Sequence, residues 1–321
     1  MTPLIERFRD RLPVSAGTPV VSLGEGSTPL LHAPRLGKLL GIDLWLKWEA
    51  SNPTGSYKDR GMTVAVSKAA EQGAKAVICA STGNTSSSAA AYAARAGIPA
   101  LILIPEGAIA GGKLIQTRAL GAKVLEVRGD FDAALAGARE LADRGTHALV
   151  NSLNPYRIEG QKTVVFEIVE ELGGAPDAFV IPYGGGGNTR AYVKGLDEAG
   201  LTTPLWSIES DDRPHTLASA IKIQTPVHRP QVEASGARVV AVTDDEIVAA
   251  WLQLAREEGL FCEPSSAAGL AWLRRGTELQ GARVVVTITG HGLKDPDIAN
   301  KHAPPPVKVD ADPDAIAAAA R

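Results

Sequence analysis

The segment of this sequence with the clearest chemical potential surrounds one lysine. Lys58 lies within residues 56–61, after the turn-forming residues 52–55 and before a helix-prone stretch at residues 62–70. This order places the lysine amine near the N-terminus of a helix, where the helix dipole disfavours positive charge and attracts anions. A lysine whose neutral amine is favoured is a candidate nucleophile for a Schiff base with a carbonyl compound. The simpler interpretation of this segment, taken alone, is a solvated helix start.

Two further loops have the composition of anion-binding sites. Residues 81–86 form a run of small polar residues between an apolar segment and an alanine-rich one, which is typical of a helix cap but also suits a carboxylate or phosphate. The second loop precedes another helix-prone stretch and consists of Gly184, Gly185, Gly186, Gly187 and Asn188. Consecutive glycines permit positive φ angles and close backbone approach, as phosphate-binding nests require. The loop matches neither a Walker motif nor G-x-G-x-x-G.

Two more loops follow predicted strands. Thr289 ends the last strong apolar run, and the loop after it contains His291, which is weak evidence for an acid or base by itself. Residues 151–157 include two asparagines, a serine and an arginine, a set that suits a second oxyanion or, more simply, a capped turn. A lysine, two anion sites and a strand-end hydroxyl together predict pyridoxal 5'-phosphate, an aldehyde cofactor whose imine would form with Lys58 and whose phosphate would bind residues 184–188. No metal-ligand spacing is found among the six histidines.

Apolar and amphipathic segments alternate from about residue 75 onward. We expect buried strands at residues 76–80, 100–104, 123–127, 178–181, 205–208, 238–242 and 283–288. We expect helices at residues 86–96, 113–120 and 131–144, and an extended C-terminal segment followed by a short helix at 315–320. Such alternation indicates parallel sheets covered on both faces, and the number of strands predicts two α/β layers. Ligands bind at the carboxyl ends of the strands in such sheets, where all four loops lie.

The composition argues against several classes of function. The chain has 321 residues, of which 45% are hydrophobic and 21% charged, as in a globular protein with room for two domains. The net charge of −3 and the lack of a basic stripe argue against nucleic-acid binding. No apolar run is long enough for a membrane span or a signal peptide. The distant Cys79 and Cys262 fit a reducing compartment, so we expect a cytoplasmic protein with Cys79 in the core.

Taken together, these loops make the chain resemble the fold-type II pyridoxal-phosphate enzymes, and within them the threonine synthases, from Leu23 to Asp297. Residues 151–163 and 289–296 look specific to threonine synthases, whereas the other motifs are widespread in the superfamily. The resemblance implies two open, mostly parallel α/β domains of the tryptophan synthase β-like kind, with the cofactor between them. We expect a large cofactor-binding domain at residues 1–62 and 152–321, a smaller mobile domain at 63–151, and a homodimer.

The resemblance also implies the residues that contact the cofactor. Lys58 would bind it covalently and later move protons, and Tyr57 would flank its ring, where phenylalanine is more usual. Asn84 would bond its 3-hydroxyl, and Thr289 would face its pyridine nitrogen. The family usually has Gly-Asn-Ala-Gly-Asn at residues 184–188; because backbone donors remain, we expect phosphate binding to survive the departure.

Two groups of residues are implied in substrate binding. The substrate carboxylate or phosphate would bind Ser81, Thr82 and Thr85. The substrate's own phosphate would bind Asn151, Ser152, Asn154 and Arg157. The favoured reaction therefore converts O-phospho-L-homoserine and water to L-threonine and phosphate, because a γ-phosphate leaves readily only where its charge is held.

Several alternatives remain at this point. A serine/threonine dehydratase or a β-replacement synthase needs no second phosphate site, and a dehydratase with a regulatory tail would need more chain after Asp297. A cysteate synthase-like enzyme acting on phosphoserine would need such a site. A non-catalytic phosphometabolite-binding protein would have no use for Lys58. About 23 residues precede Gly24, so we expect no N-terminal extension and no activation by S-adenosylmethionine.

Overall fold

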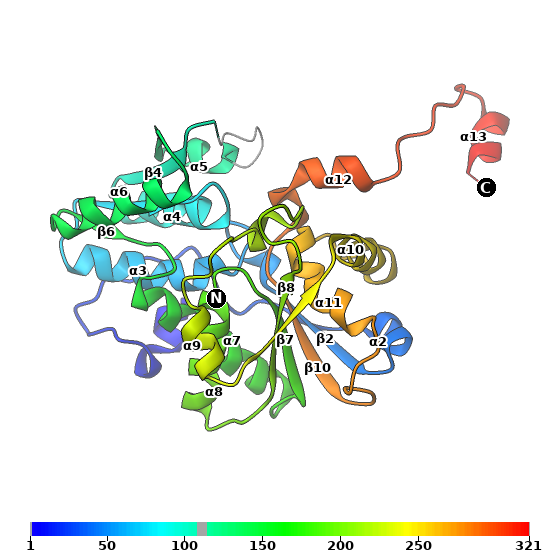
Figure 1. The fold of residues 1–321 in the computed structure, drawn as a ribbon, viewed down its shortest axis with the longest axis horizontal. Helices are drawn as coiled ribbons and strands as arrows, with labels where there is room; N and C mark the ends of the chain where they lie inside the picture. The colour runs from blue at the N-terminus through cyan, green and yellow to red at the C-terminus, as the bar shows by residue number, and fades with distance from the viewer. Residues whose placement is uncertain (1, 108–113, 321) are drawn as a thin grey trace.

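The computed structural model describes residues 2–107 and 114–320, which form two sheets flanked by helices (Figure 1). The smaller sheet has the strand order β5-β4-β3-β6, and all its pairs are parallel. Its strands are β3 (Ala76–Ala80), β4 (Ala100–Pro105), β5 (Lys123–Val127) and β6 (His147–Leu149). We call this sheet and its helices the small lobe, and the remainder of the described chain the large lobe.

The larger sheet has the order β1-β2-β10-β7-β8-β9. Its strands are β1 (Leu30–His32), β2 (Asp43–Trp48), β7 (Ala178–Pro182), β8 (Leu205–Ser210), β9 (Arg238–Val242) and β10 (Arg283–Ile288). Only the edge strand β1 is antiparallel to its neighbour. The central β10 lies between β2 and β7, so its carboxyl end opens at the middle of the sheet.

Helices cover both sheets. Those of the N-terminal half are α1 (Leu4–Arg7), α2 (Pro34–Leu40), α3 (Lys58–Glu71), α4 (Asn84–Ala96), α5 (Ile115–Ala119) and α6 (Phe131–Asp143). Those of the C-terminal half are α7 (Pro155–Leu172), α8 (Gly187–Ala199), α9 (Arg229–Ala234), α10 (Asp244–Glu258), α11 (Ala268–Leu273), α12 (Pro296–His302) and α13 (Pro313–Ala319). Helix α3 packs against both α7 and α4 and so joins the lobes. Helix α13 lies away from the body of the molecule (Figure 1).

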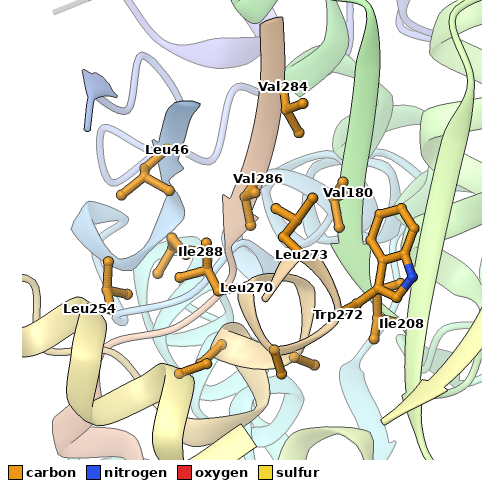
Figure 2. Close-up of a cluster of buried hydrophobic side chains, with 14 of the residues drawn as sticks. Leu46, Val180, Ile208, Leu254, Leu270, Trp272, Leu273, Val284, Val286 and Ile288 are labelled. Atoms are coloured by element: carbon orange, nitrogen blue, oxygen red, sulfur yellow. The ribbon is translucent and has the colours of Figure 1, made fainter. Parts of the chain in front are cut away.

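The largest apolar cluster lies between the six-stranded sheet and helices α10 and α11 (Figure 2). Leu270 and Leu273 of α11 pack over the β7 and β10 side chains Val180 and Val286. A Cβ at Gly269 would lie 2.9 Å from Val180, so the glycine allows α11 to approach the sheet closely. Burial of these side chains supplies the main stabilisation of the lobe and holds the strand ends in place.

Helices α3 and α7 cross at two glycines. A Cβ at Gly160 would lie 2.0 Å from the carbonyl oxygen of Arg60, and one at Gly61 would lie 2.6 Å from that of Arg157. The buried Arg60 side chain is saturated at this crossing: its Nε is 2.7 Å from Glu49 and its Nη2 is 2.6 Å from Glu167. The crossing therefore fixes the first turn of α3, which carries Lys58, against α7.

The predicted strands are confirmed, with ends that differ by at most two residues. The expectation that all of them are buried is wrong for β5 and β9, because both are edge strands whose side chains are mostly exposed or half-buried. Strands β1 and β2 and the long helix α7 were not anticipated, and β6 is the strand that was expected to end before residue 151. The predicted helices at 86–96 and 131–144 are confirmed, as is the C-terminal one; that at 113–120 corresponds to α5, and its residue 113 lies outside the described residues.

Cys79 is fully buried in the small-lobe core, as expected. The two sheets divide the chain much as the domain boundaries anticipate, but the boundaries themselves and the mobility of the smaller domain stay predictions. Within residues 2–107 and 114–320, no helix is long and apolar enough to cross a membrane.

Candidate active site

Lys58 is the first residue of α3, as its sequence context predicts. Its Nζ lies 2.6 Å from the hydroxyl oxygen of Tyr57 and 4.4 Å from the centre of that ring. The backbone N–H of Tyr57 donates to the carbonyl of Thr289 at 3.0 Å, and Ser56 forms an isolated bridge with Gly290. These bonds place the start of α3 at the carboxyl end of β10, where ligands bind in parallel sheets.

Asp59 connects the lysine turn to the small lobe. Its carboxylate accepts hydrogen bonds from the N–H and hydroxyl of Thr54, both at 2.7 Å, and from the hydroxyl of Ser88 in α4 at 2.6 Å. Burial raises the pKa of the Asp59 carboxyl to about 6, against the effect of these three donors. The residue therefore fixes Lys58 relative to α4 and is not free to contact a ligand.

The polar loop lies between β3 and α4, so its backbone N–H groups belong to a helix N-terminus. Ser81, Thr82 and Thr85 are half-buried there, and the Ser81 hydroxyl accepts from the N–H of Gly83 at 3.2 Å. Asn84 is buried, and its Nδ2 donates to the two carboxylate oxygens of Glu263 at 3.1 and 3.0 Å. The loop thus retains the geometry of an anion site beside the lysine.

Glu263 is a site residue that the sequence analysis missed. It is 3% exposed, and burial raises the pKa of its carboxyl. A Cβ at Gly290 would lie 2.5 Å from its carboxyl carbon, so that glycine is required for the carboxyl to sit beneath the end of β10. A single acidic residue between Cys262 and a run of small and apolar residues was the available signal.

The glycine loop joins β7 to the start of α8. Of its four glycines, only Gly186 has a positive φ, of 88°. The space where a Cβ of Gly185 would stand is open to 4 Å. The buried Asn188 Nδ2 and the buried hydroxyl of Tyr183 have no hydrogen-bond partner among the described residues. The loop therefore combines open backbone with unpaired polar groups.

His228, also missed by the sequence analysis, packs against this loop. Its backbone N–H donates to the carbonyl of Gly185 at 3.2 Å, and its Nε2 is 3.1 Å from the carbonyl oxygen of Ser152. Its Nδ1 is 3.2 Å from Nη1 of Arg190. Since guanidinium only donates, Nδ1 accepts and the proton is on Nε2, toward Ser152. Burial lowers the pKa of His228, which favours this neutral form.

Arg157 is buried completely at the start of α7. Its Nη1 donates to the carbonyl of Val150 at 2.8 Å, whereas Nε and Nη2 have no partner in the described part of the chain. A Cβ at Gly61 would lie 2.8 Å from Nε, so the side chain lies against the first turn of the lysine helix. Burial lowers the pKa of the guanidinium. A buried cation with unpaired N–H groups is unfavourable unless an anion binds it.

The other residues of the 151–157 loop behave differently. The Asn151 amide pairs with the backbone N–H and C=O of Ala80, at 3.0 and 2.9 Å. Asn154 caps α7 through the N–H of Tyr156 at 2.9 Å and donates to the carbonyl of Leu149 at 2.8 Å. Both amides therefore have backbone partners. Ser152 lies beside the glycine loop, with its Cβ 3.4 Å from the position of a Cβ on Gly187.

Thr289 lies where the strand-end prediction puts it, and its hydroxyl is 2.9 Å from that of Ser266. His291, in contrast, accepts from the N–H of Leu293 at 3.2 Å, and its ring packs against Trp48 and Phe261. The imidazole thus has a structural environment made of aromatic neighbours.

Residues 21–290 match the family model described as pyridoxal-phosphate dependent enzyme. The chain is 50% identical to a threonine synthase of Mycobacterium leprae, over 96% of this chain and 93% of that protein. It is 48% identical to a threonine synthase of Synechocystis sp., over 97% and 88% of the two chains, and 43% identical to one of Methanocaldococcus jannaschii, over 95% and 84%. The chain belongs to the threonine synthase family of pyridoxal-phosphate dependent enzymes.

Solved structures agree on the fold of this family. The chain superposes on maize serine racemase with a TM-score of 0.79 at 20% identity, covering 89% of this chain and 94% of that one. It superposes on the L-serine ammonia-lyase of Rhizomucor miehei with a TM-score of 0.76 at 26% identity, covering 86% and 97%. The fold is therefore of type II, and the chain is a pyridoxal-phosphate-dependent lyase.

The residues present fit the cofactor. The open space beside Gly185 and the unpaired Asn188 and Tyr183 groups suit a phosphate at the start of α8. The Lys58 amine lies at the joint between the two lobes, next to the Thr289 backbone. The roles of the individual residues toward the cofactor remain proposals, as the resemblance implied them.

Proposed function

We propose that this protein converts O-phospho-L-homoserine and water to L-threonine and phosphate. The observation that carries the proposal is the Arg157 guanidinium, which is buried beside the lysine helix with two nitrogens unpaired. Together with the glycine loop it gives two separate anion sites, as a phosphorylated substrate and a phosphorylated cofactor require. Identities of 43–50% to threonine synthases over nearly the whole chain support the same substrate.

Pyridoxal phosphate, when bound, supplies an electron sink that stabilises negative charge developing on the substrate carbons. In the proposed reaction, Lys58 first holds the cofactor, and its freed Nζ then takes the proton from the substrate Cα and returns protons during the later steps. The Tyr57 hydroxyl, 2.6 Å from that nitrogen, orients the amine. The cofactor phosphate would be bound by Gly184, Gly185, Gly186, Gly187 and Asn188. Thr289 would face the ring nitrogen of the cofactor, and Asn84 would bond its ring hydroxyl.

The chain's contribution to the leaving group is electrostatic. Arg157 and Ser152 would hold the substrate phosphate as the Cγ–O bond breaks, and part of its negative charge would be offset by a guanidinium that has no carboxylate partner among the described residues. Asn151 and Asn154 would support these residues through the backbone contacts they make. Ser81, Thr82 and Thr85 at the start of α4 would bind the substrate carboxylate.

The second candidate is a cysteate synthase-like lyase that acts on phosphoserine, because the same phosphate site would serve it. A serine/threonine dehydratase is disfavoured, since its substrate offers nothing to the unpaired Arg157. A phosphate-release assay with O-phosphohomoserine, O-phosphoserine and unphosphorylated L-threonine distinguishes these enzymes when the products are identified. We expect phosphate and L-threonine from phosphohomoserine; preferential turnover of phosphoserine, or 2-oxobutanoate from threonine at a higher rate, would overturn the proposal.

We also propose that the enzyme is a homodimer in the cytoplasm. The reduced state of the buried Cys79 and Cys262, which are not joined to each other, supports a reducing compartment. Sedimentation analysis of the purified protein and fractionation of the source cells would test the two statements; a monomer, or recovery outside the cytoplasm, would contradict them.

A further inference from the structure

Lys294 is a charged residue of the large lobe whose amine is bonded to the small lobe. It follows β10 in the 3₁₀ turn Gly292–Lys294. Its Nζ donates to the hydroxyl of Ser87 in α4 at 2.8 Å and to the side-chain oxygen of Gln116 in α5 at 2.6 Å. The third bond goes to the carbonyl oxygen of Thr54 at 3.1 Å. An ammonium group has three N–H donors, and all three have acceptors here.

These bonds form a closed polar ring with Asp59. Lys294 holds the Thr54 carbonyl and Ser87, while Asp59 holds the Thr54 N–H and hydroxyl and Ser88. Two consecutive serines near the start of α4 therefore bond groups of opposite charge: Ser87 accepts from Lys294, and Ser88 donates to Asp59. Lys294 and Asp59 are both also bonded to Thr54, in the turn that precedes Lys58.

The two charged groups of this ring are withdrawn from water to different degrees: Asp59 is fully buried, and Lys294 is half-buried. Burial lowers the pKa of the Lys294 amine, and the carboxylates of Glu263 and Asp59 counteract that effect. A lysine that is merely needed for solubility would keep its amine in water, as the exposed Lys301 of α12 does. Desolvating the Lys294 amine is compensated only when all its acceptors stay in place, so its bonds restrict the positions that α4 can take.

We propose that Lys294 is a positioning residue that sets the N-terminus of α4, and with it Ser81, Thr82 and Thr85, at a fixed distance from Lys58. The N-terminal N–H groups of α4 would then be preorganised for the α-carboxylate of an amino acid whose nitrogen is at Lys58. This inference rests on the proposed function for the identity of the substrate, but it applies to any α-amino acid bound at the lysine.

The test compares Lys294→Met with Lys301→Met in the cofactor-loaded enzyme. We expect both variants to keep the visible absorbance of the cofactor held by Lys58. In Lys294→Met, the L-threonine concentration that half-saturates the absorbance change should rise about tenfold or more, the effect of losing one charged hydrogen bond. The half-saturating concentration of 1-amino-2-propanol, which has the amine but lacks the carboxylate, should stay within about twofold of its value in the unmodified enzyme. Equal losses for both compounds, or none, would overturn the proposal.

Ser87→Ala keeps the test decisive if Lys294→Met folds poorly. This variant removes one acceptor of the Lys294 amine and the bond from the Ser87 hydroxyl to the Asn84 carbonyl at 3.2 Å, so it should weaken L-threonine binding selectively as well. Where Lys294→Met folds, the double variant Lys294→Met/Ser87→Ala should lose less than the sum of the two single variants. If the losses of L-threonine affinity in the two single variants add up fully in the double variant, Lys294 and Ser87 do not act together.

A measurement without cofactor or substrate separates this inference from the proposed function. In the cofactor-free protein, Lys294→Met should speed amide hydrogen exchange at the start of α4 while leaving the α7 and α8 amides unchanged. Unchanged exchange at α4 refutes the positioning role, whereas failure to release phosphate from phosphohomoserine in the unmodified enzyme refutes only the assigned substrate.

Discussion

The two buried arginines at the crossing of α3 and α7 predict opposite responses to the same substitution. Arg60 bonds Glu49 and Glu167, so each of its nitrogens has a buried partner. Arg157 has one bond, to the carbonyl of Val150, and two unpaired nitrogens. Methionine keeps an unbranched apolar side chain and removes the charge, so Arg60→Met and Arg157→Met form a matched pair at equal burial.

The two variants should differ in the unfolding free energy of the free enzyme. Arg60→Met removes the buried cation that Glu49 and Glu167 share, although Glu167 keeps its contact with the Lys47 Nζ at 3.3 Å. Breaking a buried ion pair costs about 3–5 kcal/mol of unfolding free energy. Arg157→Met loses one hydrogen bond, worth about 1–3 kcal/mol at a charged donor, but it also removes a desolvated charge that has no carboxylate partner. The two effects oppose each other, so we expect a net change of less than about 1 kcal/mol for Arg157→Met.

In catalysis we expect the opposite order, with a specific loss of activity in Arg157→Met. Losing the contact of Arg157 with the substrate phosphate removes about 1.5–3 kcal/mol, which lowers kcat/KM roughly tenfold to a hundredfold. Because the phosphate is the leaving group, part of the loss should appear in kcat and part in KM. Cofactor absorbance should remain, since the cofactor phosphate is assigned to the glycine loop.

Thermal unfolding of the cofactor-loaded protein with inorganic phosphate gives the assay. The glycine loop is then filled by the cofactor, so added phosphate reports on the second site. At a hundred times its dissociation constant, phosphate should stabilise the wild-type enzyme by about 2.7 kcal/mol and Arg157→Met much less. A folded, yellow Arg157→Met enzyme with wild-type kinetics and a wild-type response to phosphate would refute the assignment of the second anion site.

Three further predictions follow from the site and the packing beneath it. Borohydride should fix the cofactor to the peptide that contains Lys58, and label on another lysine would contradict the assignment. Burial raises the pKa of Glu167, but Arg60, Lys47 and the N–H of Ser27 together lower it to about 2, below its ordinary 4.5. The stabilisation that corresponds to this shift, on the order of 3 kcal/mol, is present above pH 4.5 and lost as the pH falls through 2. Urea unfolding at pH 5 and pH 3 should therefore show a larger loss in the wild type than in Glu167→Gln, and equal losses would argue against it. Gly160→Ala should cost about 1–3 kcal/mol or more, because its Cβ would lie 2.0 Å from the Arg60 carbonyl, whereas Gly174→Ala meets nothing within 4 Å and serves as the control.

The sequence predicted the parts of the fold that have a local signal. Continuous apolar segments identified the central strands β3, β4, β7 and β10, because a strand buried on both faces needs apolar side chains throughout. Strand β2 was not predicted because Asp43 and Lys47 interrupt its apolar pattern, and Lys47 is paired with Glu171 far along the chain. Helix α7 was not predicted because its buried positions include charged residues such as Glu167, which pairs with Arg60 of another helix.

For the candidate active site too, the residues with a local sequence signal were the ones that could be predicted. Lys58 and the glycine loop lie beside turn and helix signals, so their positions at helix starts were predictable. Glu263 and Lys294 become meaningful only through Asn84 and Ser87, which are 179 and 207 residues away in the chain. Composition also could not tell a ligand-binding asparagine from one that bonds the backbone, as Asn151 does.

The most direct test of the proposed function is the reaction of phosphohomoserine in ¹⁸O-labelled water. Elimination breaks the Cγ–O bond and water then adds at Cβ, so the label should enter the hydroxyl of threonine and not the released phosphate. One phosphate should appear for each threonine formed. Label in the phosphate would mean that the P–O bond is cleaved, and homoserine as the product would identify a phosphatase; either result would contradict the account.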